Sequence, residues 1–139
     1  MESDRGERPP ILDNLATRKG PPTFAHYSEA EFARILSFYE IEWQYEPRSF
    51  PLRWDTNGRV LEYFTPDFYL PEFDLYVELT TLKQSLVTKK NRKLRRLREL
   101  YPEINIKLFY GRDVRSLLTK YGVRRREAVA SGAKNTSPK

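Results

Sequence analysis

The segment 74–110 constrains the fold most strongly, because its pattern changes from strand to helix and back to strand. Residues 74–80 alternate between two sets of β-forming side chains, which predicts a strand with two different faces. A basic helix is expected over residues 88–100 and ends before Pro102. The largely apolar run 104–110 then predicts a buried strand. Together these elements indicate an α/β fold in which helices flank a sheet.

The residues before this segment predict one helix and several short strands. An S-x-x-E capping box at Ser28 and Glu31, followed by apolar side chains at helical spacing, predicts a helix over 28–39. Alternating or β-rich runs predict strands at 41–46, 50–54, 60–64 and 67–70. The turn signal Asp-Thr-Asn-Gly at 55–58 makes a hairpin of the middle two. With a last helix over 114–121, the order is α-β-β-β-α-β-α around a mixed central sheet.

The composition excludes several kinds of active site. The chain of 139 residues has no cysteine and one histidine, His26. Structural zinc sites, iron–sulfur clusters, disulfides and cysteine nucleophiles all need a thiol. A metal site with two histidines is also excluded, and a Ser-His triad would depend on His26 alone. Carboxylates, hydroxyls, lysine amines and a hard metal ion such as Mg²⁺ remain.

The formal charge of +6 is unevenly distributed along the chain. Residues 79–98 hold eight Lys and Arg side chains and no Asp or Glu. Such a run is either a solvated helix face or a surface that follows phosphate groups of a nucleic acid. We predict a flexible N-terminal arm over 1–22, a single domain over 23–122, and a basic flexible tail over 123–139.

The sequence also bears on location. No run of about 18 apolar residues could span a membrane, and no apolar stretch follows the charged N-terminus as a signal peptide would require. A soluble, cytoplasmic protein is therefore expected.

Two carboxylates are candidates for chemistry. Asp67 directly follows a proline, and Glu78 lies in the middle of a strand, where an unpaired charge is costly. Eleven residues separate them, which is enough for a turn and a return strand, so the two side chains could converge and hold Mg²⁺. Alternatively, Asp67 caps the turn after Pro66, and Glu78 pairs with an arginine.

An ordered set of motifs over residues 28–110 resembles the PD-(D/E)XK nuclease superfamily. The motif residues are Tyr45-Glu46, the stretch Tyr63-x-Thr65-Pro66-Asp67-Phe68-x-Leu70-Pro71, Val77-Glu78-Leu79-Thr80 and Tyr101-Pro102-Glu103. More narrowly, the chain is similar to phage Holliday-junction-resolving endonuclease I and to transposase-associated endonucleases. The resemblance implies a restriction-endonuclease-like core of α-β-β-β-α-β order.

The resemblance also assigns roles to individual residues. It implies that Asp67 and Glu78 bind the metal and act in catalysis, and that Glu29 of the first helix completes the metal site. The implied metal is Mg²⁺, with Mn²⁺ as a substitute. Thr80 stands where the family has its catalytic lysine. In this superfamily the lysine can lie on the following helix instead, and Lys90 is the first candidate because it shares a stripe with apolar helix residues. The other candidates are Lys83, three residues beyond Thr80, and Lys93, on the flank of the same stripe. Lys90 could alternatively snorkel to water.

The implied activity is hydrolysis of DNA phosphodiester bonds by a metal-dependent endonuclease, at branched or structured DNA. The resemblance favours DNA over RNA, and junction cleavage would need a homodimer. The basic residues expected to contact nucleic acid are Lys89, Arg92, Lys93, Arg95, Arg96 and Arg98. Two alternatives remain open. One is a non-catalytic nucleic-acid-binding module of the same fold, and the other is an endonuclease subunit that depends on a partner.

Overall fold

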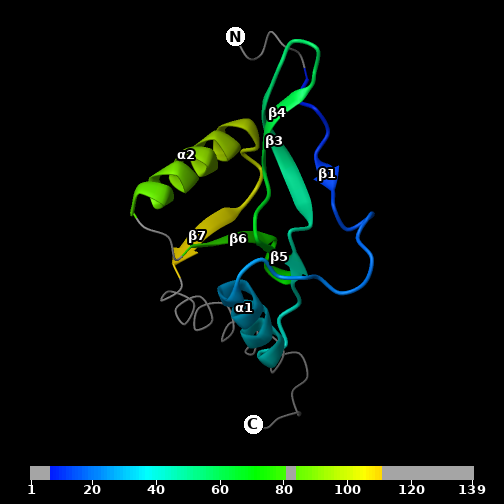
Figure 1. The fold of residues 1–139 in the computed structure, drawn as a ribbon, viewed down its shortest axis with the longest axis vertical. Helices are drawn as coiled ribbons and strands as arrows, with labels where there is room; N and C mark the ends of the chain where they lie inside the picture. The colour runs from blue at the N-terminus through cyan, green and yellow to red at the C-terminus, as the bar shows by residue number, and fades with distance from the viewer. Residues whose placement is uncertain (1–6, 81–83, 111–139) are drawn as a thin grey trace.

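A computed structural model of the chain describes residues 7–80 and 84–110 (Figure 1). The expected last helix at 114–121, the C-terminal tail and Lys83 lie outside the described residues. In chain order the elements are β1 (Leu12–Asp13), α1 (Tyr27–Phe38), β2 (Gln44–Tyr45), β3 (Arg48–Trp54), β4 (Val60–Phe64), β5 (Phe68–Leu70), a short 3₁₀ turn (Pro71–Phe73), β6 (Leu75–Thr80), α2 (Gln84–Leu100) and β7 (Ile106–Tyr110). The fold is therefore mixed α/β, as the sequence predicts, but five strands rather than three lie between α1 and α2.

The strands form two sheets. A three-stranded sheet has the order β1-β3-β4, and a four-stranded sheet has the order β2-β5-β6-β7. All pairs are antiparallel except β6 and β7, which are parallel and are joined through α2. Parallel neighbours need a crossover connection, and the basic helix supplies it. The predicted strand-helix-strand unit is confirmed.

The two faces of β6 pack into different cores, as its alternation predicts. Leu75, Val77 and Leu79 belong to a cluster with α1, β2 and β5. Tyr76 belongs to a second cluster, which is formed with the hairpin of β3 and β4 and with Leu94 and Leu97 of α2. Both clusters consist of large apolar side chains that are almost completely buried. Strand β6 is thus surrounded by protein on both faces, and any carboxylate on it is removed from water.

The predicted hairpin is confirmed. Strands β3 and β4 pair with Phe50 opposite Phe64, and the pairing is irregular between Pro51 and Trp54. The Asp55 carboxylate accepts hydrogen bonds of 2.9 Å from the backbone N–H groups of Asn57 and Arg59. Gly58 adopts a φ of 84°, a conformation that glycine permits without steric cost. The turn residues therefore act as the sequence indicates.

Three of the predicted element boundaries are wrong. Helix α2 begins at Gln84, four residues before the predicted start, because neither glycine nor proline interrupts the sequence from there. The strand expected over 41–46 is reduced to β2. The last strand begins at Ile106, and only that residue of it is buried. The prediction of a buried strand fails because β7 is the outermost of the four strands described.

The cap of α1 also differs from the prediction. The helix begins at Tyr27, and its N-cap residue is His26 rather than Ser28. The third helical position is therefore occupied by Glu29, whose carboxylate accepts a hydrogen bond from the backbone N–H of His26 at 3.4 Å. Glu31 instead pairs with Arg34 on the surface of the helix. The glutamate of the capping box is thus also the residue proposed as a metal ligand.

Residues 7–22, which the sequence analysis places in an arm, contact the rest of the molecule. Strand β1 pairs with β3, and Leu12 lies opposite Ser49. Asn14 donates side-chain hydrogen bonds of 3.0 Å to the Glu46 carbonyl and to the Ser49 hydroxyl. The described part of the arm therefore extends the small sheet.

Within the described residues, no helix is long and apolar enough to cross a membrane.

Candidate active site

Asp67 and Glu78 lie side by side because β5 and β6 pair antiparallel. The register sets Phe68 opposite Val77, so the next step places Asp67 opposite Glu78. The Asp67 N–H donates to Glu78 Oε1 at 3.1 Å, and the Leu79 N–H donates to Asp67 Oδ2 at 2.8 Å. Each carboxylate is 7% exposed or less. The convergence expected from their spacing is therefore present in the fold.

Lys90 reaches this pair from α2. Its Nζ lies 2.8 Å from Glu78 Oε2 and donates to the Leu79 carbonyl at 2.7 Å. The apolar residues Leu94 and Leu97 follow Lys90 at helical spacing and are buried, so Lys90 lies on the core-facing stripe as predicted. Glu78 therefore pairs with a lysine, rather than with the arginine of the alternative interpretation.

The opposite wall is supplied by the start of α1. The cavity, of about 510 Å³, is lined by residues 25–29, Glu46, Asp67, Leu79, Thr80 and Lys90. Glu29 is buried, and its Oε1 accepts hydrogen bonds from the Tyr45 hydroxyl at 2.6 Å and from the Ala25 N–H at 3.1 Å. Glu29 and Asp67 therefore line one cavity, and Glu78 adjoins it through its contacts with Asp67 and Lys90.

The cavity disfavours the ionised forms of its two neighbouring carboxylates. Burial, followed by repulsion from Glu78, raises the pKa of Asp67 to about 8. Burial also raises the pKa of Glu78, although the Lys90 ammonium and its hydrogen bond act in the opposite direction. Loss of hydration destabilises an ionised carboxylate, and a nearby carboxylate of the same charge adds to the effect. One lysine therefore only partly offsets the negative charge of the cavity.

Three further residues, to which the sequence motifs assign no specific role, shape this site. Glu46 lines the cavity in a left-handed conformation with a φ of 44°, and its N–H donates to the Asp67 carbonyl at 2.8 Å. Tyr45 holds Glu29, as described above. Arg18 donates to the carbonyls of Tyr45 and Glu46, at 2.5 and 3.2 Å. The Tyr45-Glu46 motif signalled the first two residues, but Arg18 carries no local signal.

The basic residues of α2 have diverse contacts. Lys89 and Arg95 are exposed. Arg92 and Lys93 lie 3.5 and 3.8 Å from Glu62 of β4. Arg96 donates to the Leu52 carbonyl at 3.2 Å. These five residues give α2 a cationic outer face, part of which is turned toward the hairpin.

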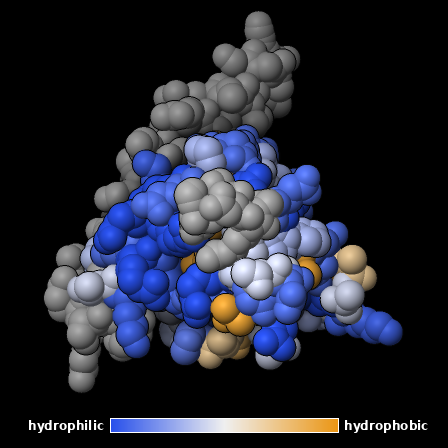
Figure 2. Space-filling model, turned by 90° about the horizontal axis from the view of Figure 1, so that it is seen from above, coloured by the Kyte–Doolittle hydropathy of each residue, from blue (hydrophilic) through white to orange (hydrophobic). Residues whose placement is uncertain are grey.

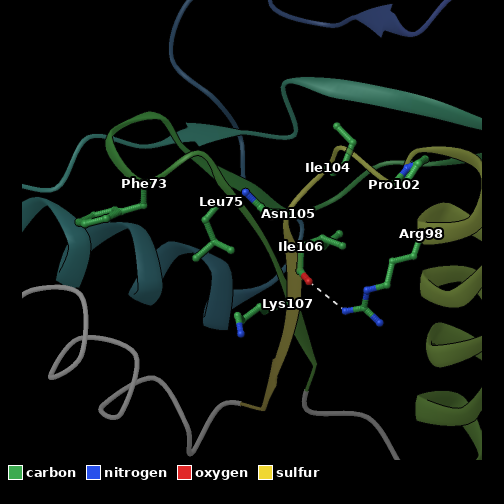
Figure 3. Close-up of a pocket in the computed structure, with 8 residues that line it drawn as sticks. All are labelled: Phe73, Leu75, Arg98, Pro102, Ile104, Asn105, Ile106 and Lys107. Carbon is green, nitrogen blue, oxygen red and sulfur yellow. Dashed lines mark hydrogen bonds between the residues drawn. The ribbon is translucent and has the colours of Figure 1, made fainter.

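Arg98 is placed at a second cavity of about 540 Å³, at the other end of β6 and β7 (Figure 3). Its guanidinium donates to the Ile106 carbonyl at 2.9 Å, and apolar side chains such as Leu75 and Ile104 line the wall. This cavity contains none of the predicted carboxylates. Arg98 is thus separated from the cavity of Asp67 and Glu78.

Two observations bear on a metal at the Asp67 cavity. Within residues 7–80 and 84–110, no group of three or more His, Asp or Glu side chains has the geometry of a preformed metal cluster. Mg²⁺, however, is commonly held by only one or two carboxylates, with water and substrate phosphate completing its shell. Asp67 and Glu78 match that donor chemistry.

Comparisons with known protein families, with curated proteins and with solved structures find no match to this chain.

Proposed function

We propose that this protein is a metal-dependent endonuclease that hydrolyses DNA phosphodiester bonds. The observation that carries the proposal is that Asp67, just before β5, and Lys90 of α2 line one cavity and both contact Glu78 of β6. The strand-helix-strand unit of β6, α2 and β7 and the Thr-Pro-Asp motif support a restriction-endonuclease-like core. Under this proposal the three residues form the PD-(D/E)XK site, and Lys90 takes the role of the lysine that Thr80 replaces.

Asp67 and Glu78 would hold Mg²⁺ or Mn²⁺, and Glu29 would contribute from the facing helix. When bound, such an ion polarises the phosphate and lowers the pKa of a water ligand. The raised pKa of Asp67 reflects the unfavourable energy of holding two ionised carboxylates together without a compensating dication. Placing two positive charges there would lower it again. A metal-binding pair of carboxylates is expected to destabilise the folded protein when no metal is bound.

Lys90 would place a positive charge beside the scissile phosphate. Its Nζ lies between Glu78 Oε2 and the Leu79 carbonyl, so its position is fixed by two acceptors. An ammonium at this place neutralises a phosphate oxygen and orients an attacking water by hydrogen bonding. Electrostatic stabilisation of this kind does not require the lysine to come from the strand. The helix offers the same charge from the other side of Glu78.

The test is cleavage of supercoiled plasmid and of a four-way DNA junction, with Mg²⁺ or Mn²⁺. Wild-type protein is expected to cut at least one of the two substrates. Asp67→Asn, Glu78→Gln and Lys90→Ala are each expected to reduce the rate about a hundredfold or more. Glu31→Gln, which removes an exposed carboxylate on α1, is the matched control and should leave the rate unchanged. Intact substrates with wild-type protein, or equal rates in wild type and Asp67→Asn, would refute the proposal.

Thr80 favours a second candidate, a nuclease-like fold that binds nucleic acid without cleaving it. In that case Lys90 serves only to neutralise Glu78. DNA binding would then survive Asp67→Asn, and calorimetry would detect no stoichiometric Mg²⁺ binding. Tight Mg²⁺ binding that is lost in Asp67→Asn would exclude this candidate and support the endonuclease.

A further inference from the structure

The hairpin and α2 meet at a single carboxylate surrounded by cations. Glu62 of β4 lies 3.6 Å from the Nε of Arg53 on β3, 3.5 Å from Arg92 and 3.8 Å from the Lys93 ammonium. These four residues, here called the Glu62 cluster, carry three positive charges and one negative charge. Their formal sum is +2, on a small area shared by two elements that are far apart in the sequence.

The contacts in the Glu62 cluster are loose. Charge-assisted hydrogen bonds from an ammonium or guanidinium to a carboxylate are typically about 2.7–2.9 Å long, whereas all three distances here are 3.5 Å or more. The Arg53 and Arg92 side chains are also more than half exposed. Although the Glu62 side chain is only 19% exposed, long contacts to exposed cations of this kind contribute little to stability. The cluster is therefore not explained as a device that holds the hairpin to α2.

The charge of the cluster matches a phosphate group. Three donors that surround one carboxylate oxygen pair can equally surround the oxygens of a phosphodiester, and clustered Lys and Arg gain affinity by releasing counterions from nucleic acid. Arg53 reaches the cluster from the hairpin, so its donors approach from a different direction than those of α2. The end of the molecule where the hairpin lies in Figure 1 is largely hydrophilic among the described residues (Figure 2). Such a surface fits a charged partner rather than an apolar one.

The cluster is also close to the candidate active site. Lys93 follows Lys90 by three residues, which is a rise of about 4.5 Å along a helix. Phosphates of one DNA strand are spaced about 3.4 Å apart along the duplex axis. For a duplex that lies along α2 with its scissile phosphate at Lys90, a phosphate one or two nucleotides away would thus lie near Lys93.

We propose that Arg53, Arg92 and Lys93 form a phosphate clamp for the DNA strand next to the cleaved bond, and that Glu62 occupies it in the absence of DNA. Glu62 then competes with the substrate. It keeps the free clamp from binding anions indiscriminately and is displaced when a phosphate arrives. This inference rests on the proposed function for the identity of the nucleic acid. The clamp adds Arg53 to the binding surface and gives Glu62 an inhibitory role.

The test measures the affinity of the full chain for a labelled duplex of about 20 base pairs. Fluorescence anisotropy reports the binding, in EDTA and at about 50 to 200 mM salt. Glu62→Gln is expected to tighten binding about three- to tenfold at the lowest salt. Arg53→Gln and Arg92→Gln are expected to weaken it to a similar degree, and each should reduce the salt slope by about one. Glu42→Gln, an exposed acid outside the cluster, and Arg34→Gln, an exposed cation on α1, are the matched controls.

Weaker or unchanged binding by Glu62→Gln, or a gain no larger than that of Glu42→Gln, would overturn the clamp. The assay contains no divalent metal, so it separates the two proposals. If the plasmid assay shows no cleavage while Glu62→Gln still tightens binding, the nuclease proposal fails and the clamp stands. If the plasmid is cleaved while substitutions in the Glu62 cluster leave binding unchanged, the clamp fails and the nuclease proposal stands.

Discussion

Glu78 and Glu62 both pair with cations of α2, and they do so in opposite environments. Glu78 is almost fully buried and lies 2.8 Å from Lys90. Glu62 is partly exposed, and its partners Arg92 and Lys93 lie 3.5 and 3.8 Å away. A buried charge that loses its partner is severely destabilised, whereas an exposed one is solvated by water. The same helix therefore holds one pair that the fold depends on and another whose contacts are free to rearrange.

The contrast also separates two kinds of functional signal. At Glu78, retaining two carboxylates in a desolvated cavity has a large energetic cost, and such costs concentrate at functional sites. At Glu62, the cost is small, so the information lies in the number and placement of the cations. The first site indicates chemistry, and the second indicates a binding surface. If burial is the property that distinguishes them, substitutions at the two sites should differ in their effects on stability.

The largest stability effect is expected from Lys90→Met. The substitution leaves Glu78 buried without its cation, and breaking a buried pair costs about 3–5 kcal/mol. Because about a fifth of the Lys90 side chain is exposed, the lower end of that range is expected. The free energy of unfolding in urea measures it. A loss of unfolding free energy below about 1 kcal/mol would show that the buried pair stabilises the fold no more than the pair of Arg92 and Glu62 does.

The second prediction concerns pH in the absence of divalent metal. The pKa of Asp67 is raised from its ordinary value near 4 to about 8 in the folded state. Between these values the folded protein binds more protons than the unfolded chain, so the free energy of unfolding falls as pH rises. A fall of about 2 kcal/mol or more is expected, since one pKa unit corresponds to about 1.4 kcal/mol.

Thermal unfolding in EDTA across this pH range tests the second prediction, and Asp67→Asn is the matched variant. It should flatten the pH dependence and be more stable than wild type at pH 7, even though it loses the proposed activity. Mg²⁺ should stabilise wild type and not the variant, because a ligand that binds only the folded state stabilises it. A wild-type stability that increases from pH 4 to 8 would contradict the assignment.

An intermediate effect is expected from Tyr45→Phe. The variant retains the buried ring and removes the hydroxyl that donates to Glu29 at 2.6 Å. We expect a loss of about 1 kcal/mol in unfolding free energy and a tenfold or greater loss in metal affinity, since partners that orient a ligand have effects of about 10- to 100-fold. Isothermal titration with Mn²⁺ measures the affinity. Tyr39→Phe provides a control in which a less buried tyrosine loses its hydroxyl.

The smallest stability effect is expected from Arg92→Met. Arg92 is more than half exposed and lies 3.5 Å from Glu62, which is 19% exposed, and long pairs with an exposed cation contribute about 0–1 kcal/mol. Urea unfolding should therefore be almost unchanged, although DNA binding weakens. High salt should remove any difference that remains, because exposed pairs are screened. A loss of unfolding free energy as large as that of Lys90→Met would show that the Glu62 cluster is needed for folding stability, as the buried pair is.

Much of the candidate site was predictable because its geometry follows from local periodicity. Eleven residues containing a turn bring Asp67 opposite Glu78 when the two strands pair. The helical repeat from Lys90 to Leu94 and Leu97 predicts that the lysine faces the core. Both arguments use neighbouring residues and a regular repeat. Their catalytic roles remain predictions that no comparison with known proteins tests.

Other parts of the site depend on contacts between distant residues. Arg18 binds the carbonyl of Tyr45, 27 residues away, and no local pattern connects the two. The capping-box prediction failed at Ser28 because two overlapping boxes were available. The selected box is the one whose glutamate, Glu29, also meets the Tyr45 hydroxyl. The choice between such alternatives is made by packing.

By itself, the sequence determined the chemistry that remains available and the strand-helix-strand unit of β6, α2 and β7. A chain without cysteine and with one histidine is limited to carboxylates, hydroxyls and amines, and the alternation of residues 74–80 fixes a strand with two faces. Only the tertiary structure decided which charges are buried together. Charge is a property of each residue, but its energetic cost depends on the water and the partners that the fold leaves around it. That is why Glu78 and Glu62, equivalent in sequence, differ so much in the folded protein.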